Sequence, residues 1–502
     1  MNRRWTLALC AVGTIALAFG VVIADRYPVG VFHDDAMYVI LARSLATGQG
    51  FRYLNIPGAP LASHFPPGYP FVLSLVWRLL PVFPANVLAF KLLNAVFFSA
   101  SAVLITQLAR ERFDDSRAAV IVGLLSAISV PFLVLVSMVL SEPMFLALLL
   151  GLLIVAERLV ASPMSRSRAL ACGACIGLLT LVRAHGIVML PAVMIPLALH
   201  RRWKDAALVA FAAVAAMLPW QLWGAAHSAA LPPPLAGNYG SYVAWWIRGY
   251  RDMGPVMILE TVRRTTSEVV AMLATLFSPG QATAVRVMTL ASLTGVFVAG
   301  AVHLRRHAPV TLGFLAWYAA IVLAWPFPPS RFVWGVWPLL LFLIVAAARA
   351  RVPARLALAG ALVWLTVGYA EYEVRAIRGK WWSSISRTSS QRIQPAVAWV
   401  LANTAPDDVV AADDEGSVFL YTGRQAVPVA SFTTSHYLRD RSAAVEAEEG
   451  LVPLLAAFPV RAVLVGSQKT FNAAEFLVTR PTPLLARREQ FAGGAAFTVP
   501  DR

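Results

Sequence analysis

The stretch "VFHDDAMYVILARSLATGQGF", residues 31–51, places a histidine and two adjacent carboxylates shortly after an apolar run. That run, Trp5 to Ala24, follows "MNRR". Its apolar portion of about 20 residues exceeds the 7–15 residues of a usual signal-peptide core and suits a transmembrane helix. We interpret it as an uncleaved first helix with a cytoplasmic N-terminus. His33, Asp34 and Asp35 then begin a segment outside the bilayer.

The composition is that of a polytopic α-helical membrane protein. Of the 502 residues, 59% are hydrophobic and 14% are charged, whereas a soluble domain usually has about 25% charged residues. Apolar runs recur as far as residue 372 and predict about eleven transmembrane helices. The predicted spans are 5–24, 85–108, 117–137, 141–159, 169–183, 186–200, 206–224, 284–304, 310–326, 332–349 and 355–372.

The basic residues predict the orientation of these spans. The net charge is +16, but the basic side chains form short clusters in every second connection, as the positive-inside rule requires. We therefore expect no nucleic-acid partner, a cytoplasmic N-terminus and an outer C-terminus. Three pieces then face outward: the loop 25–84, the loop 225–283 and the tail 374–502.

The tail differs in composition from the transmembrane catalytic domain expected at residues 1–373. It brings in acidic stretches such as "PDDVVAADDEG", and "AVAWVLANTAPDDVVAA" alternates helix and strand patterns. We predict a small extracytoplasmic α/β domain. An aromatic belt at the outer interface is expected at Trp245, Trp246, Trp381 and Trp382.

The segment "DDAMYVILARSLATGQG" predicts a short helix, and its acids have two interpretations. Asp34 could be the N-cap, with Asp35 favoured by the helix dipole. Alternatively, one carboxylate is catalytic and the other supports it, since neighbouring helical residues point about 100° apart. A carboxylate near another and partly removed from water is a better proton acceptor. An apolar stripe is expected to lie on the membrane surface: Met37, Ile40, Leu41 and Leu45.

A rigid turn follows in "LASHFPPGYPFVLSL", residues 61–75. Its prolines and Gly68 fix the backbone ahead of a helix. His64 precedes the turn and is therefore held by stiff backbone. A lone histidine is more often structural, but His64 shares one loop with His33, Asp34 and Asp35.

The three cysteines, Cys10, Cys172 and Cys175, all lie in apolar runs and cannot form a disulfide framework. "CGAC" at 172–175 has the spacing of a redox or zinc motif, yet the chain offers no second ligand pair. We interpret these cysteines as small helix-packing residues.

Taken in order on the predicted membrane side, these pieces resemble the GT-C glycosyltransferases. The resemblance is greatest to the bacterial relatives of protein O-mannosyltransferases, lipid A aminoarabinose transferases and lipopolysaccharide-core galacturonosyltransferases. It covers most of residues 1–372, including "LSEPMF" at 140–145, "LVRAHG" at 181–186 and "PPSRFVWGVWPLL" at 328–340. In the tail, "YTGRQAVPV" at 421–429 is similar to the outer domains of this group.

The resemblance implies a multi-pass protein of the bacterial inner (plasma) membrane with its reaction centre on the outer face. Its donor would be a polyprenyl-phosphate-linked sugar, and a lipid, a glycan or a protein could be the acceptor. Asp34 matches the first acid of the family's outer-loop pair, which acts as the catalytic base or orients it, and Asp35 matches the second. His64 stands where aminoarabinose transferases have a functional Glu, a departure that suggests a different acceptor or lipid-phosphate contact. Arg331 matches an arginine that contacts the carrier phosphate.

Further residues near the outer ends of spans are candidates for binding the carrier phosphate or the acceptor. Charged groups within a membrane protein are costly, about 2.5–3.5 kcal/mol on insertion scales, so they are often functional. Arg183 could assist Arg331 or snorkel to the interface. Glu142 could orient a basic partner, contact the acceptor or cap a helix end, and Lys91 is a weaker candidate.

Two alternatives to a metal-free transferase follow from the same residues. His33, Asp34, Asp35 and His64 could hold a divalent metal, although arginines on the phosphate make one unnecessary, and we expect no obligatory cofactor. A transporter or flippase of lipid-linked envelope precursors would share the many spans. It would require acids in mid-membrane and a repeat between the halves of the chain, neither of which is evident.

Overall fold

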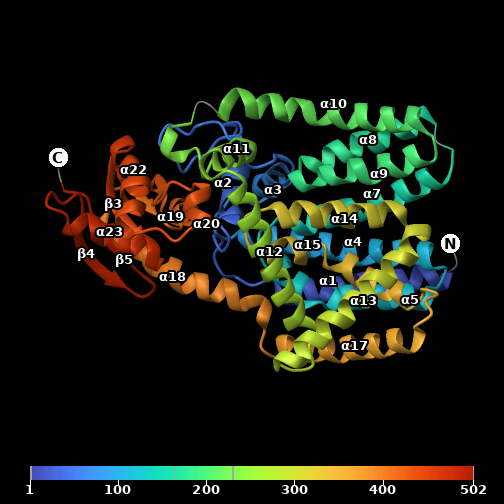
Figure 1. Ribbon diagram of the computed structural model, residues 1–502. Helices are drawn as coiled ribbons and strands as arrows, with labels where there is room; N and C mark the ends of the chain where they lie inside the picture. The colour runs from blue at the N-terminus through green and yellow to red at the C-terminus, as the bar shows by residue number, and fades with distance from the viewer. Residues whose placement is uncertain (1–2, 164, 229–230, 501–502) are drawn as a thin grey trace. The chain divides into compact units, whose positions relative to one another are not determined.

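The computed structural model describes residues 3–163, 165–228 and 231–500 and is mostly helical (Figure 1). The chain divides into two compact units, each built from three separate segments. The first unit contains 1–25, 91–219 and 261–383, and the second contains 26–90, 220–260 and 384–502. The second unit therefore joins the tail to the loop after the first helix and to the segment before residue 261.

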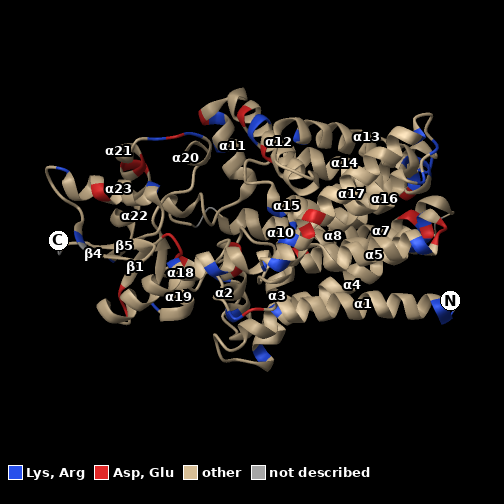
Figure 2. Ribbon diagram, turned by 90° about the horizontal axis from the view of Figure 1, so that it is seen from below, with Lys and Arg blue, Asp and Glu red and all other residues tan. Residues whose placement is uncertain are grey.

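The first unit is a helical bundle whose main helices run roughly parallel (Figure 1). In Figure 2 these helices are tan along most of their length, and charged residues gather near their ends. Three of its helices, α4, α10 and α12, continue into the second unit. The elements are α1 (Arg3–Ile23), α4 (Val87–Phe113), α5 (Ser116–Ile128), α6 (Val130–Val136), α7 (Glu142–Ala161), α8 (Arg166–Thr180), η1 (Ala184–Val188), α9 (Met189–Leu199), α10 (Trp203–His227), α12 (Pro255–Phe277), α13 (Thr283–His307), α14 (Pro309–Ala324), α15 (Ser330–Gly335), α16 (Trp337–Ala347) and α17 (Arg355–Arg378).

Each of the predicted spans falls on helix in the described chain. By length and composition, five of these helices are able to cross a membrane, α1, α4, α7, α10 and α13, or six if α5 and α6 count as one bent span. The bend of 52° follows Ile128, where the Glu373 carboxylate accepts hydrogen bonds from the Val130 N–H at 3.1 and 3.2 Å. Shorter apolar helices at Ala184–Leu199, Pro309–Ala324 and Trp337–Ala347 complete the bundle. The count of about eleven spans stays a prediction.

The segment predicted as the outer loop 25–84 contributes α2 (Asp34–Ala46) and α3 (Gly68–Leu79) to the second unit. The prediction that α2 lies on the membrane surface is wrong, because Asp35 to Ala42 are all buried. Helix α3 packs along α2, and α19 (Glu415–Thr422) of the tail also contacts it. The apolar side chains of α2 thus face protein, whereas Phe71, Leu75 and Leu79 of α3 are exposed.

The segment predicted as a loop at 225–283 is largely helical. Besides the end of α10 it contains η3 (Pro233–Leu235), α11 (Tyr242–Met253) and α12. Trp245 does not belong to an exposed aromatic belt, since its ring stacks on Phe432 and its Nε1–H donates to the Phe432 carbonyl at 2.9 Å. Helix α11 therefore packs against the tail.

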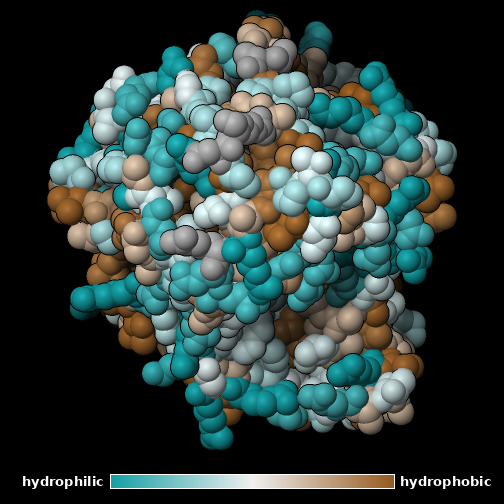
Figure 3. Space-filling view, turned by 90° about the vertical axis from the view of Figure 1, so that its left-hand side faces the viewer, coloured by the Kyte–Doolittle hydropathy of each residue, from teal (hydrophilic) through white to brown (hydrophobic). Residues whose placement is uncertain are grey.

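The tail folds as an α/β domain, as its composition predicts. Its five-stranded sheet has the order β2-β1-β3-β5-β4. Strand β1 pairs in parallel with β2 and β3, whereas β5 pairs antiparallel with β3 and β4. Figure 3 shows the side of the molecule that lies on the left in Figure 1, and this surface is mainly hydrophilic. The elements are α18 (Trp381–Asn403), β1 (Val409–Ala412), α19, β2 (Ala426–Pro428), α20 (Thr434–Leu438), α21 (Ala443–Glu446), η4 (Ala447–Leu451), α22 (Val452–Ala457), β3 (Val460–Val465), α23 (Gln468–Thr479), β4 (Ala486–Phe491) and β5 (Gly494–Thr498).

Candidate active site

The turn before α2 has an unusual backbone. His33 has φ 64° and ψ −55°, and the Asp34 N–H donates to the Phe32 carbonyl at 2.6 Å. These values describe a γ-turn of the rare, strained kind centred on His33. His33 is consequently the N-cap position, and Asp34 is the first residue of the helix. The interpretation of Asp34 as N-cap is therefore wrong.

The two carboxylates have different surroundings. Asp35 is 1% exposed, and its carboxylate accepts hydrogen bonds from the N–H groups of Gly30, Val31 and Phe32 at 2.7, 3.1 and 3.1 Å. It thereby holds the loop that leads into the helix. Asp34 is only partly buried, whereas the carboxylate of Asp35 is buried and fixes backbone.

A third carboxylate from the tail reaches this turn. Glu415, with a side chain that is 2% exposed, accepts a hydrogen bond from His33 Nε2 at 2.9 Å. It also accepts one from the Tyr239 hydroxyl at 2.8 Å. Asn55 Nδ2 donates to that same hydroxyl at 3.0 Å. The segments that contain His33, Tyr239 and Glu415 thus meet at one buried network within the second unit.

Sequence reasoning missed Glu415 and Tyr239. The acids of "DDEG" at 413–416 are evident in the sequence only as a change of composition, and Tyr239 lies in an unremarkable "GNYG" at 237–240. A glutamate beside a glycine in a tail with many acids is a weak signal. Only the fold brings Glu415 to His33.

His64 lies on the same unit but is held differently. Its Nδ1–H donates to the Gly240 carbonyl at 2.5 Å, and its ring contacts Tyr242 with centroids 3.9 Å apart. Burial lowers the pKa of His64 to about 4. The imidazole is therefore neutral near pH 7, with its proton on Nδ1 and a lone pair on Nε2.

The first unit contains a separate cluster of three sequence-predicted residues. Glu142, whose side chain is 2% exposed, accepts from Arg183 Nη1 at 2.8 Å and from Arg331 Nε at 2.5 Å. Arg183 also donates to the Ser141 hydroxyl at 3.0 Å. Two guanidinium groups around one carboxylate leave this arginine cluster with a net positive charge, which suits an anionic ligand.

Lys91 is separate from that cluster. Its ammonium group is 2% exposed and donates to Asp25 Oδ1 at 2.5 Å. Breaking such a buried pair is strongly destabilising. The Asp25 partner gives Lys91 a structural role where helix α4 enters the first unit.

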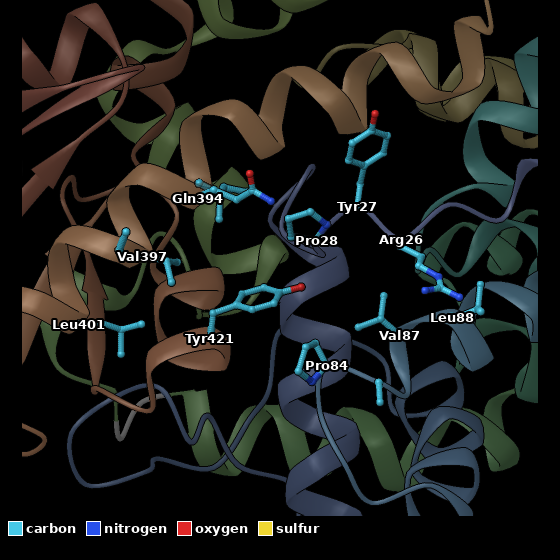
Figure 4. A pocket seen from close by; sticks show the side chains of 13 residues that line it. Arg26, Tyr27, Pro28, Pro84, Val87, Leu88, Gln394, Val397, Leu401 and Tyr421 are labelled. Atoms are coloured by element: carbon cyan, nitrogen blue, oxygen red, sulfur yellow. The ribbon is translucent and has the colours of Figure 1, made fainter.

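The second unit also has a mainly apolar cavity of about 740 Å³. Figure 4 shows Tyr421, Pro28, Pro84 and Val397 around it, with Arg26 at one side. The hydroxyl of Tyr421 accepts from the N–H of Val29, one residue before the loop held by Asp35. The cavity thus adjoins the loop, although neither Asp34 nor Asp35 lines it.

The described residues contain no group of three or more His, Cys, Asp and Glu side chains placed to hold a metal ion. Near the start of α2, two of the predicted metal ligands are hydrogen-bonded to protein groups. His33 Nε2 is bonded to Glu415, and the carboxylate of Asp35 is bonded to three backbone N–H groups. These residues do not fit a preformed metal site.

Comparison with known proteins identifies the fold. No family model matches the chain, and no curated protein matches it. Among solved structures, ArnT from Cupriavidus metallidurans bound to undecaprenyl phosphate is similar over 99% of this chain and 98% of its own, with TM-score 0.58 and 14% identity. The chain has the GT-C fold.

The likeness extends to other GT-C structures. ArnT from the same organism in the apo state covers 98% of this chain and 97% of its own, with TM-score 0.56 and 14% identity. The archaeal oligosaccharyltransferase AglB from Archaeoglobus fulgidus, in complex with an inhibitory peptide and a dolichol-phosphate, covers 91% of this chain and 69% of its own, with TM-score 0.55 and 14% identity. The prediction of a mostly helical, GT-C-like chain with a small C-terminal sheet is confirmed. The division into domains at residue 373 stays a prediction.

Proposed function

We propose that the chain is an inverting glycosyltransferase that moves a sugar from a polyprenyl-phosphate-type carrier to a hydroxyl of an envelope acceptor. The observation that carries this proposal is the partly exposed Asp34 at the start of α2, set beside the buried Asp35, in a chain with the GT-C fold. The similar structures support the kind of donor, since one is bound to undecaprenyl phosphate and another to a dolichol-phosphate.

The reaction is a single in-line displacement. The acceptor oxygen forms a bond to the anomeric carbon while its proton passes to the Asp34 carboxylate. The bond from that carbon to the phosphate oxygen breaks, and the electron pair leaves with the phosphate. Because the phosphate is already an anion, it needs positive charge around it more than it needs a general acid.

The arginine cluster supplies that positive charge. Arg331 and Arg183 share the Glu142 carboxylate, which fixes both guanidinium groups before any ligand arrives. An arginine pairs with phosphate through two parallel N–H···O bonds. Arg331 therefore binds the carrier phosphate, with Arg183 assisting and Glu142 positioning both.

His64 contacts the acceptor. At neutral pH its Nε2 is a hydrogen-bond acceptor, which suits a sugar hydroxyl better than an anionic phosphate. Both acids and His64 belong to the second unit, and on the topology predicted by the basic clusters this unit lies outside the cytoplasm. The sugar is thus transferred on the outer face of a bacterial plasma membrane.

A loss-of-function comparison tests the proposal. Envelope glycolipids and glycans are extracted from cells with and without the protein and compared by mass spectrometry. We expect one sugar to disappear from one acceptor class and to return with the wild-type gene but not with Asp34→Asn. Identical envelopes, or an accumulated lipid precursor with every glycan intact, would favour the transporter alternative.

A further inference from the structure

The contact between Glu415 and His33 lies outside the set of residues proposed to bind the carrier phosphate and the acceptor. Glu415 is the first residue of α19, which belongs to the α/β domain, whereas His33 belongs to the loop after the first helix. Their side chains meet at 2.9 Å, and Tyr239 donates to the same oxygen of Glu415. A buried carboxylate with two donors is a positioned group.

Helix α19 is fixed on this loop by its neighbouring residues. The Ser417 hydroxyl donates to the Val29 carbonyl at 3.1 Å, and the Tyr421 hydroxyl accepts from the Val29 N–H at 3.1 Å. Gly416 lies so close to α2 that a Cβ there would be 2.5 Å from Met37 Cε. Glu415 therefore has little freedom to leave His33.

The backbone at His33 is strained, and strain of this kind is retained where the surroundings over-determine it, often at functional sites. Helix α19 and the carboxylate of Asp35 hold the loop from both sides. The strained turn is centred on His33, which immediately precedes Asp34 in the chain and whose side chain is 35% exposed.

The three carboxylates near His33 favour its protonated form. Burial alone would lower the pKa of His33, but Glu415 from α19 and then Asp34 and Asp35 from α2 raise it to about 9. His64 opposes them only if protonated, and its own pKa is about 4 because of burial. Tyr239 stays neutral, since burial and Glu415 raise its pKa.

We propose that Glu415 is a positioning residue of the transfer reaction: through it the α/β domain holds His33 as an imidazolium at the turn that begins α2, and this ion pair fixes the position from which Asp34 meets the acceptor hydroxyl. This inference rests on the proposed function. It gives the tail a place in the reaction centre.

The matched variants are Glu415→Gln and Glu446→Gln. Glu446 is the control because it is another buried glutamate of the α/β domain that pairs with a histidine, here with His436 Nδ1 at 2.5 Å and also with Lys469 Nζ at 2.9 Å. His33→Asn removes the charge by a second route, and asparagine tolerates a positive φ better than most residues.

Two measurements test the inference. The first is an NMR titration of the full-length protein labelled at its 8 histidines, in which His33 is assigned by His33→Asn. The second is the rate of sugar transfer against pH, with a lipid extract from envelopes that lack the protein as the source of donor and acceptor. The product is the one that mass spectrometry identifies as missing.

We expect His33 to titrate near pH 9 in the wild type and at least one pH unit lower in Glu415→Gln. The rate at pH 7.5 falls about tenfold or more, and the alkaline limb of the profile moves to lower pH by the same interval. His33→Asn matches this loss, and the double variant is no worse than either single one. Glu446→Gln leaves the titration and the profile unchanged.

A wild-type profile in Glu415→Gln would overturn the inference, and so would an equal change in Glu446→Gln. Asp34→Asn separates this failure from a failure of the proposed function. If Asp34→Asn is inactive while Glu415→Gln keeps the wild-type profile, only the role of Glu415 is lost. If Asp34→Asn is fully active, the mechanism itself is wrong.

Discussion

At the scale of single residues, the structure gives Asp34 and Asp35 different surroundings, which the sequence "DD" alone does not reveal. The carboxylate of Asp35 accepts hydrogen bonds from three successive backbone N–H groups and is buried. That of Asp34 is partly exposed on the first helical turn. Asp35 therefore stabilises the loop, and Asp34 is the acid that we propose acts in the reaction.

Asp34→Asn distinguishes the catalytic from the structural role. As a helix-start acid, Asp34 contributes about 0.3–1 kcal/mol through the helix dipole, whereas removal of a general base typically lowers the rate by about 10²–10⁴-fold. We expect a normally inserted protein with an almost unchanged thermal midpoint and no sugar transfer. Turnover within a few-fold of wild type would leave Asp34 only a structural role.

Asp35→Asn gives the opposite pattern. The amide N–H₂ of asparagine faces backbone N–H groups that need an acceptor, and an unsatisfied buried donor costs about 1–3 kcal/mol. We expect a lower thermal midpoint together with lost activity, measured by thermal unfolding in detergent. A stable but inactive Asp35→Asn protein beside an active Asp34→Asn protein would exchange the two roles.

Arg331→Lys tests the phosphate site with a retained charge. Lysine lacks the planar fork that binds two phosphate oxygens at once, and hydrogen bonds to charged groups are worth about 1.5–3 kcal/mol. We expect undecaprenyl phosphate to bind about tenfold more weakly or worse. Arg158→Lys is the control, since Arg158 pairs with Glu111 in the same unit. Equal affinity in the wild type and Arg331→Lys would place the phosphate elsewhere.

The two histidines predict how stability depends on pH. The pKa of His33 is raised from 6.5 to about 9, so its stabilising contribution is complete below about pH 6.5 and is lost as pH rises through about 9. The pKa of His64 is lowered to about 4, so its contribution is present above about pH 6.5 and is lost toward pH 4. Thermal midpoints should be highest near neutral pH, and His33→Asn should flatten only the alkaline side.

At the scale of elements, the contact of α19 with the loop 29–33 depends on close packing. Gly30 has φ +109°, and a Cβ there would meet Ser417 Oγ at 1.7 Å. Gly48 also has a positive φ, +75°, but a Cβ there meets nothing within 4 Å. The pair therefore separates backbone strain from the contact with α19.

Gly30→Ala should destabilise the second unit by about 1–3 kcal/mol more than Gly48→Ala. It should also lower activity, because Ser417 and its neighbour Glu415 must shift. Thermal unfolding and the transfer rate check both effects. If the two variants behave alike, the packing of α19 against the loop is unimportant.

The sequence predicts elements better than it predicts their burial. Apolar periodicity correctly locates α2, but it cannot tell a face covered by lipid from one covered by α3 and α19, because both coverings are apolar. Likewise, Trp245 could face an interface or stack on Phe432. The γ-turn at His33 is invisible in sequence, since it depends on hydrogen bonds to Asp35 and on contacts with the tail.

At the scale of the whole molecule, the sequence identifies the acids, His64 and the arginines as separate candidates. The structure shows that Glu142, Arg183 and Arg331 are in contact, which their spacing of up to 189 residues conceals. It also groups the tail with the loop that carries Asp34. Pairings between distant segments are out of reach of sequence reasoning, because no local pattern encodes them.

Orientation is a testable property of the full chain. Every basic cluster is cytoplasmic if the C-terminus lies outside, so alkaline phosphatase fused after Arg502 should be active. The same enzyme inserted beside Arg305 and Arg306 should be inactive. The reverse pattern would place the second unit in the cytoplasm and exclude an outer reaction centre.

The order in which the segments of the second unit occur along the chain has a consequence for biosynthesis. Chains are made and fold from the N-terminus, so His33 and Asp34 emerge early, and Glu415 emerges 382 residues after His33. With the role proposed for Glu415, a nascent or prematurely terminated chain that lacks α19 is inserted but transfers sugar about tenfold more slowly or worse. A chain that has passed residue 34 but not residue 415 thus holds the proposed base without the residue proposed to position it, and we expect it to transfer sugar slowly.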